Sequence, residues 1–247
     1  AALTFLNGLY GYFILPESLA PENRRAFDWK RANPWGSLKQ LQKYPVLIGL
    51  VVSLMLLYVA SHAVQSNWGY YTKEKFAWDP KMIGWSLMVV GFVFALVQGA
   101  LLRVIIPKIG QNRSVYVGLA MYALGFILFA FASQSWMMFA FTVVYCLGGI
   151  AGPAIQGIMS SQVPPNEQGE LQGALTSMMS LTSIIGPLIM MGTFSYFTSK
   201  NAPFYLPGAS MLLGAVLAIA STYLARRSLK KTQSRPVTPP VADPVIH

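Results

Sequence analysis

The chain has 247 residues, of which 54% are hydrophobic and only 11% are charged, whereas about 25% of the residues of an ordinary soluble domain are charged. This composition excludes a soluble globular protein. The net charge of +10 could suggest a nucleic-acid partner, but the lysines and arginines lie mainly in short connectors and near the C-terminus, so we interpret the charge as a topology signal and expect no nucleic acid.

The chain opens with an apolar segment, residues 1–15, that is shorter than the roughly 20 residues needed to cross a bilayer. It has neither an initiating Met nor the basic start of a signal peptide. We therefore expect it to be the end of a preceding, sixth transmembrane helix. Residues 16–44 are polar and contain Pro21, Pro34 and Gly36, and they are predicted to form a cytoplasmic linker between two helical bundles.

Six apolar stretches follow, each long enough to cross lipid as a helix, the form that pairs its own backbone polar groups. They cover residues 45–65, 82–102, 114–132, 136–160, 171–197 and 203–225. Pro45 and Pro203 suit a first helical turn, and Asp79 before Pro80 is typical of an N-cap followed by position N1. The predicted fold class is an all-α membrane protein with a six-transmembrane-helix bundle over residues 45–226. The basic, Pro-rich residues 227–247 are predicted to form a disordered cytoplasmic tail.

Basic residues are distributed unequally between alternate connectors. The connectors on the side of the 16–44 linker hold Arg24, Arg25, Lys30, Arg31, Lys39, Lys43, Arg103, Lys108, Arg113, Arg226, Arg227, Lys230, Lys231 and Arg235. The opposite side holds Lys73, Lys75, Lys81 and Lys200. Because basic connectors are retained in the cytoplasm, we expect both chain ends there and a multi-pass location in the inner membrane.

Polar side chains within the spans are the candidate site. His62 and Gln65 are three residues apart and are predicted to share one helical face, which should point to a substrate cavity or to a neighbouring helix because polar groups are costly in lipid. Gln98 and Gln156 are single amides beside Gly or Pro, and the same two interpretations remain open for them. The predicted substrate-binding residues are His62, Gln65, Gln98 and Gln156.

Two clusters of glycine and proline lie inside spans, where glycine allows close approach of helices and proline removes one helical hydrogen bond. The first comprises Gly148, Gly149, Gly152 and Pro153, and the second comprises Gly186 and Pro187. Both are predicted to be helix breaks of the kind that transporters use near a central cavity, although close packing alone explains them equally well.

No acidic residue lies at the centre of a span, although intramembrane carboxylates are the usual proton carriers of pumps. We therefore expect the proton-carrying residue outside this chain. The sequence has no H-E-x-x-H, G-x-S-x-G or Walker A motif, and its single cysteine, Cys146, cannot form a disulfide within the chain. We predict no enzyme activity, no metal site and no bound cofactor.

Several motifs together resemble one family. They are Leu15-Pro16-Glu17-Ser18, Phe76-Ala77-Trp78-Asp79, Gly148-Gly149-Ile150, Pro153-Ala154-Ile155-Gln156, Gln168-Gly169-Glu170-Leu171-Gln172-Gly173 and Ser180-Leu181-Thr182-Ser183-Ile184-Ile185-Gly186-Pro187-Leu188. The chain resembles the C-terminal half of the tetracycline-resistance efflux branch of the major facilitator drug:proton antiporters. The resemblance implies a twelve-helix fold whose N-terminal six-helix bundle is the partner of this one. It also implies alternating access driven by the proton gradient, and a small amphiphilic drug as substrate, with a magnesium–tetracycline chelate as one candidate.

The resemblance also bears on individual residues. His62 stands where the tetracycline exporters carry a cavity glutamine, whereas Gln98 and Gln156 match glutamines. Arg103, Lys108, Gly110 and Arg113 fall in the expected cytoplasmic gate loop, and Arg103 replaces a glycine there. Ser161 stands where the family commonly has arginine.

Two other function classes remain open from the sequence. One is a major facilitator importer of another small solute such as a sugar or peptide, although the spans offer few charges to hold such cargo. The other is a non-transporting membrane scaffold or assembly partner of half length.

Overall fold

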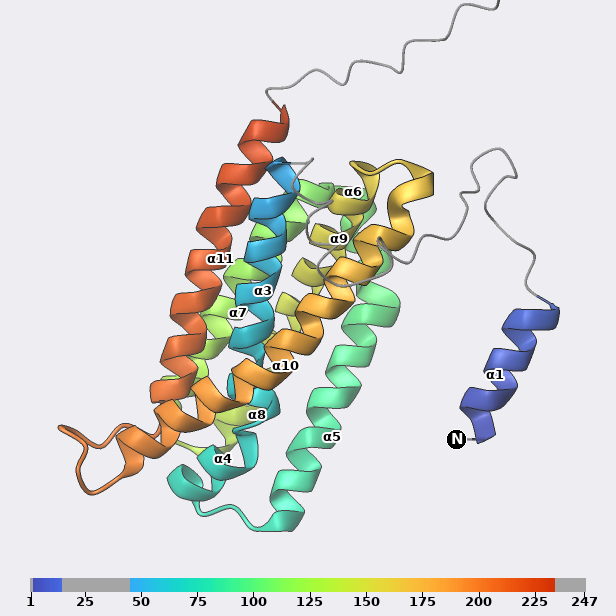
Figure 1. Cartoon of the computed structure of the whole chain (residues 1–247). Coiled ribbons are helices and arrows are strands. Elements are labelled where there is room, and N and C mark those ends of the chain that lie inside the picture. Colours follow the sequence, from blue (N-terminus) through green and yellow to red (C-terminus); the bar gives the residue numbers. More distant parts are fainter. Residues whose placement is uncertain (1, 15–44, 234–247) are drawn as a thin grey trace, which may run out of the picture.

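The computed structural model describes residues 2–14 and 45–233, and each regular element in these ranges is a helix (Figure 1). The elements are α1 (Ala2–Phe13), α3 (Pro45–Gln65), α4 (Trp68–Phe76), α5 (Pro80–Leu96), η2 (Val97–Leu101), α6 (Leu102–Ile109), α7 (Gln111–Phe131), α8 (Ser135–Leu147), η3 (Gly148–Ile150), α9 (Ala151–Ser161), η4 (Pro165–Glu167), α10 (Gln168–Thr198) and α11 (Ala209–Gln233). The predicted linker over 16–44 and the Pro-rich part of the tail lie outside the described residues.

Six of these helical segments are long and apolar enough to cross a membrane. They are α3, the continuous run α5–η2–α6, α7, the run α8–η3–α9, α10 and α11. This confirms the predicted all-α bundle of six membrane helices. Whether α1 is the end of a further membrane helix stays a prediction; Leu3 and Tyr12 on it are each 83% exposed.

Three predicted boundaries are wrong. The second span continues through α6 to Ile109, so the predicted connector from Arg103 onward is helical up to Gly110. The last helix begins at Ala209 instead of Pro203 and continues to Gln233, past the predicted start of the tail. The predicted first turns at Pro45 and Asp79-Pro80 are confirmed, and the Asp79 carboxylate accepts a hydrogen bond of 2.8 Å from the backbone N–H of Met82.

A short helix, α4, covers the end of the bundle opposite Gly110 (Figure 1), and it lies between two predicted spans, where no helix was predicted. Trp68 and Tyr71 of α4 are buried, and the indole N–H of Trp68 donates to the Ser86 hydroxyl at 2.8 Å. The Tyr205 hydroxyl in the α10–α11 connector donates to the Glu74 carboxylate at 2.7 Å. This hydrogen bond raises the pKa of Tyr205 above its usual value. Aromatic burial and these hydrogen bonds hold α4 against α5 and the α10–α11 connector.

The helices pack around α3 and α7. Figure 1 shows α11 along one side of the bundle, α5 on the other, and α10 crossing in front of α3. α3 contacts both α10 and α11, whereas α7 contacts α11, α8 and α9, and α5 packs mainly on α8. Ser53 of α3 and Ser221 of α11 are both buried, and each hydroxyl donates to the other residue's carbonyl, at 2.9 and 2.8 Å. Small residues and interhelical hydrogen bonds of this kind drive helix association in lipid, where apolar burial alone does not.

Two of the membrane helices are covered far less than the others. Within the most apolar part of the Pro80–Ile109 span only 6% of the residues are buried, against 67% for Leu47–Gln65. The span that contains α10 is also weakly covered, at 28%. Large apolar side chains are exposed on both, including Phe92 on α5 and Leu188 on α10. α5–α6 and α10 therefore form the open flanks of the bundle.

Candidate functional site

A cavity of about 570 Å³ lies between α3, α5 and the broken helix α8–η3–α9. We call it the central cavity. It is lined by Leu57, Tyr58, Ser61, Val64, Gln65, Val90, Gly91, Phe94, Ala95, Gln98, Tyr122, Tyr145, Gly149, Gly152, Pro153 and Gln156. Three of the four predicted substrate-binding residues, Gln65, Gln98 and Gln156, thus come from different segments to one cavity.

Each of the three amides is held by a hydrogen bond in the cavity wall. The Gln65 amide donates to the Ser61 hydroxyl at 2.8 Å, and the Gln156 amide donates to the Tyr58 hydroxyl at 3.0 Å. The Gln98 amide donates a longer hydrogen bond, 3.5 Å, to the Gly149 carbonyl. An amide has two N–H donors and a carbonyl acceptor, so each of these side chains retains groups with which it can bind a ligand.

The cavity is walled by two irregular helical segments that face each other. η2, which contains Gln98, is a π-helical segment inside the second span, and η3 is a 3-10 turn that separates α8 from α9. The predicted helix break at Gly148–Gly149 is therefore observed, whereas the π-helical segment was not foreseen. π-helical segments inside α-helices occur frequently at functional sites.

Glycines set the shape of this wall. A Cβ atom on Gly149 would lie 2.9 Å from the Phe94 ring, so Gly149 lets η3 approach α5 closely. A Cβ atom on Gly152 would meet no other heavy atom within 4 Å. Because Gly152 lines the central cavity, its missing side chain leaves room that a ligand can occupy.

The chemistry of the central cavity suits an amphiphilic ligand. None of the described residues that line it is charged; the lining combines apolar and aromatic surface with amides and hydroxyls. A lone ion would lack a compensating charge there and would be costly to bury. The aromatic rings of Phe94, Tyr122 and Tyr145 can pack against apolar rings of such a ligand, and the three amides can bind its hydrogen-bonding groups.

His62 does not line the central cavity, contrary to the prediction that it shares a cavity face with Gln65. Its imidazole packs against Gly186 of α10, and its Nδ1 lies 3.2 Å from the Ser66 hydroxyl. Residues three apart on a helix differ by about 60° in direction, and this angle is enough to aim His62 at α10 while Gln65 borders the cavity. His62 therefore packs on the neighbouring helix α10, but the hydrogen bond of its ring goes to Ser66 and not across to that helix.

Gly186→Ala is expected to destabilise the protein through His62. A Cβ atom at residue 186 would lie 2.2 Å from Cδ2 of His62, and such overpacking costs about 1 to 3 kcal/mol. Truncation by His62→Ala should remove most of that cost. Thermal unfolding of the wild type, both single variants and the double variant measures the coupling. Gly192→Ala in the same helix is the control, since its Cβ would meet nothing within 4 Å; an equal cost of Gly186→Ala with and without His62 would contradict the contact.

The other predicted packing residues are placed as follows. Gly148 packs against the Tyr122 ring, which a Cβ atom on this glycine would approach to 2.5 Å, and Pro153 lines the central cavity. The predicted second helix break is wrong, because α10 runs unbroken from Gln168 to Thr198 with Pro187 inside it. Proline removes only one hydrogen bond of the helix, and packing on either side can preserve the helical path. Pro187 instead borders a separate groove beside Asn67 and Tyr70.

The predicted cytoplasmic gate loop is a sharp corner between helices instead of a loop. Arg103 and Lys108 lie in α6 and Arg113 lies in α7, so Gly110 alone separates the two helices. Gly110 has a φ of 83° and a ψ of 156°, a positive-φ backbone conformation that glycine adopts without strain. Gly110 and Arg113 line a second pocket at this corner, described below, which does not include Arg103 or Lys108.

Several cavity residues were missed by the sequence analysis. Tyr58 and Ser61 precede Gln65 by seven and four residues, so the helical spacing of polar groups could have identified them. Tyr122 lies in a span for which the sequence analysis named no polar candidate, whereas Tyr145 shares its span with Gln156. Among the described residues, no group of three or more His, Cys, Asp or Glu side chains could hold a metal ion.

The acidic residues of the described part of the chain lie near the helix ends. Glu74 and Asp79 lie in or beside α4, and Glu167 and Glu170 lie at the start of α10. None of them lines the central cavity.

These observations define a multi-pass membrane protein with a ligand-sized cavity between broken helices. The family model of the Major Facilitator Superfamily matches residues 50–245, and the chain belongs to this superfamily, whose members are transporters and not enzymes.

The chain is similar to several curated proteins. Tetracycline resistance protein, class C, of Escherichia coli is 33% identical over 220 residues, which are 89% of this chain and 55% of that protein. Tetracycline resistance protein, class E, of Escherichia coli is 38% identical over 149 residues, which are 60% of this chain and 37% of that protein. Hippocampus abundant transcript-like protein 1 of Homo sapiens is 27% identical over 226 residues, which are 85% of this chain and 45% of that protein. The chain spans about half the length or less of each of these relatives.

Proposed function

We propose that this chain is the C-terminal half of a proton-coupled exporter of an amphiphilic drug such as a tetracycline, and that the central cavity is its part of the substrate site. The observation that carries this proposal is the convergence of Gln65, Gln98 and Gln156 on one uncharged cavity. The similarity to tetracycline resistance proteins supports the substrate class. A tetracycline, free or as its magnesium chelate, offers rings and many oxygen atoms to such a lining.

In this proposal an N-terminal six-helix bundle supplies the opposite wall, connected through residues 16–44. α5 lines the central cavity, and α10 packs on α3. The large exposed apolar side chains of the open flanks provide the surface on which a second bundle can pack. Alternating access then consists of rocking of the two bundles around the substrate. The chain's span of about half of its relatives is consistent with this arrangement.

The proton carrier is assigned to the other bundle, because the acidic residues that the structure describes lie near helix ends and none lines the cavity. The proposed location is the inner membrane with both chain ends in the cytoplasm. Among the described residues, the arginines lie near the corner at Gly110 and at the end of α11, whereas the opposite end of the bundle carries Lys73, Lys75, Lys81 and Lys200.

The test uses the complete protein that contains this chain, in everted membrane vesicles. Tetracycline uptake should depend on the proton gradient and stop on addition of a protonophore. Gln156→Ala should lower transport efficiency roughly fivefold, the equivalent of one lost hydrogen bond of about 1 kcal/mol. The matched control is Gln134→Ala, in the exposed α7–α8 connector away from the cavity.

Three results would count against the proposal. Proton-independent uptake of the drug, or transport of another solute only, would favour the alternative of an importer. The absence of any transport by the folded protein would favour the scaffold. Equal effects of Gln156→Ala and Gln134→Ala would remove the central cavity from the substrate path.

A further inference from the structure

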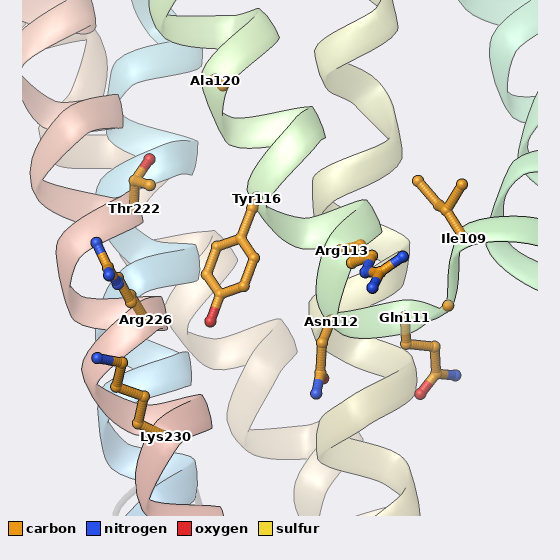
Figure 2. Close-up of a pocket in the computed structure, with 10 residues that line it drawn as sticks. Ile109, Gln111, Asn112, Arg113, Tyr116, Ala120, Thr222, Arg226 and Lys230 are labelled. Atoms are coloured by element: carbon orange, nitrogen blue, oxygen red, sulfur yellow. The ribbon is translucent and has the colours of Figure 1, made fainter. Parts of the chain in front are cut away.

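A second pocket, of about 1020 Å³, lies between α7 and α11 at the end of the bundle that contains Gly110. We call it the basic pocket. It is lined by Ile109, Gly110, Gln111, Asn112, Arg113, Tyr116, Ala120, Thr222, Arg226 and Lys230. Figure 2 shows Arg226 and Lys230 extending from α11 beside Tyr116, with Asn112 and Arg113 on the first turn of α7. This pocket shares no residue with the central cavity.

The basic pocket is built for negative charge. It collects basic side chains from two helices, Arg113 from α7 and both Arg226 and Lys230 from α11, and no acidic residue is among the described residues that line it. The first turn of α7 adds the positive end of a 21-residue helix. The side chains of Asn112, Tyr116 and Thr222 add hydrogen-bonding groups to these charges. A phosphate group carries the negative charge that the basic side chains and the helix end attract, and its oxygens can accept hydrogen bonds from the polar side chains.

The surface beyond the basic pocket, toward the middle of the spans, is apolar. On α11 the exposed side chains preceding Arg226 are Tyr223, Ile219 and Val216, at 65, 54 and 60% exposure. On α7 the exposed side chains following Arg113 include Val117 and Leu124. Since α7 and α11 pack against each other, these residues continue the pocket along the membrane helices as an apolar strip. A soluble phosphate would leave this strip unused, whereas the acyl chains of a lipid would lie on it.

We propose that the basic pocket binds the headgroup of an anionic phospholipid, whose acyl chains lie on the apolar strip of α7 and α11. Basic pockets between membrane helices are suited to anionic headgroups. By the proposed topology, this lipid belongs to the cytoplasmic leaflet. Most residues that line the site lie on α7 and α11, and only Ile109 comes from α6. The site shares no residue with the central cavity, so binding does not depend on the proposed drug transport.

The test is lipid retention by the complete protein, purified in detergent and examined by native mass spectrometry. Phosphatidylglycerol should be retained in preference to phosphatidylcholine with the same acyl chains. The pair Arg113→Gln and Arg226→Gln should lower phosphatidylglycerol affinity roughly 30-fold, which corresponds to about 1 kcal/mol for each basic residue near the membrane surface. Millimolar inorganic phosphate should not displace the lipid.

The matched control is the pair Arg103→Gln and Arg227→Gln, which removes the same charge from α6 and α11 outside the basic pocket. It should retain phosphatidylglycerol as the wild type does. If the pocket pair does not fold, each single variant should still lower affinity by roughly fivefold. Equal retention of the two lipids, an equal loss in the control pair, an unchanged affinity in the pocket variants, or displacement by phosphate would each overturn the proposal.

Discussion

Gly152→Leu is expected to leave the protein folded and to lower drug transport by roughly tenfold or more, because a side chain built into a ligand site acts directly against the ligand. A Cβ atom at residue 152 would meet no heavy atom within 4 Å. Leucine is also a better helix former than glycine. The added side chain would therefore occupy the central cavity without straining α9. Drug uptake into everted vesicles and the thermal unfolding midpoint of the purified complete protein measure the two effects separately.

Gly69→Leu is the matched control for this experiment. Gly69 lies in α4, away from the open flanks, its Cβ position is equally open, and it does not line the central cavity. Its transport should stay near that of the wild type. Wild-type transport by Gly152→Leu would show that the substrate does not enter the central cavity beside α9, and the proposed site would then have to be abandoned.

Gly118→Ala is expected to lower the stability of the protein, whereas Gly152→Leu lowers transport and leaves stability unchanged. The effect of Gly118→Ala comes from helix packing and not from the ligand site. A Cβ atom at residue 118 would lie 2.6 Å from the backbone nitrogen of Ala151 and 2.9 Å from its Cα atom. These are backbone atoms, so no side-chain rotation relieves the clash and α7 must move away from α9. We expect a cost of about 1 to 3 kcal/mol, seen as a lower thermal unfolding midpoint.

Gly125 provides a second position of the same kind on α7. Its Cβ would lie 2.7 Å from Cα of Tyr145 in α8. The double variant Gly118→Ala, Gly125→Ala should therefore separate α7 from the whole α8–η3–α9 run and yield little folded protein. Gly84 lies in α5, and a Cβ atom there would meet nothing within 4 Å. Gly84→Ala should therefore be neutral or stabilising by about 0.5 to 1 kcal/mol, as is usual for alanine in a helix interior. A midpoint of Gly118→Ala no lower than that of Gly84→Ala would contradict the close packing of α7.

The two glycine predictions separate the two uses of small residues in this bundle. At Gly118 and Gly125 the absence of a side chain brings backbones together, whereas at Gly152 it leaves space in the central cavity. The sequence shows glycine in apolar spans in both cases. The distinction depends on which helix lies opposite.

The features that the sequence determined by itself are those that depend on neighbouring residues in the chain. Length and hydropathy predicted six membrane helices, because a helix that crosses lipid needs a continuous apolar run. The Asp79-Pro80 helix start and the break at Gly148 were also predictable, since capping and backbone conformation are local properties. The rarity of polar groups in the spans was enough to select Gln65, Gln98 and Gln156.

Only the tertiary structure decided the direction in which each polar group points. His62 was selected by the same argument as Gln65, yet a difference of about 60° around α3 places it against Gly186 of α10. The π-helical turn at Gln98 and the unbroken course of α10 through Pro187 also depend on what packs beside each helix. Arg113 and Arg226 line one basic pocket because α7 packs on α11, and no local pattern of the sequence predicts this. Hydropathy decides whether a segment enters the membrane, but the neighbours of a side chain are fixed only when the helices pack.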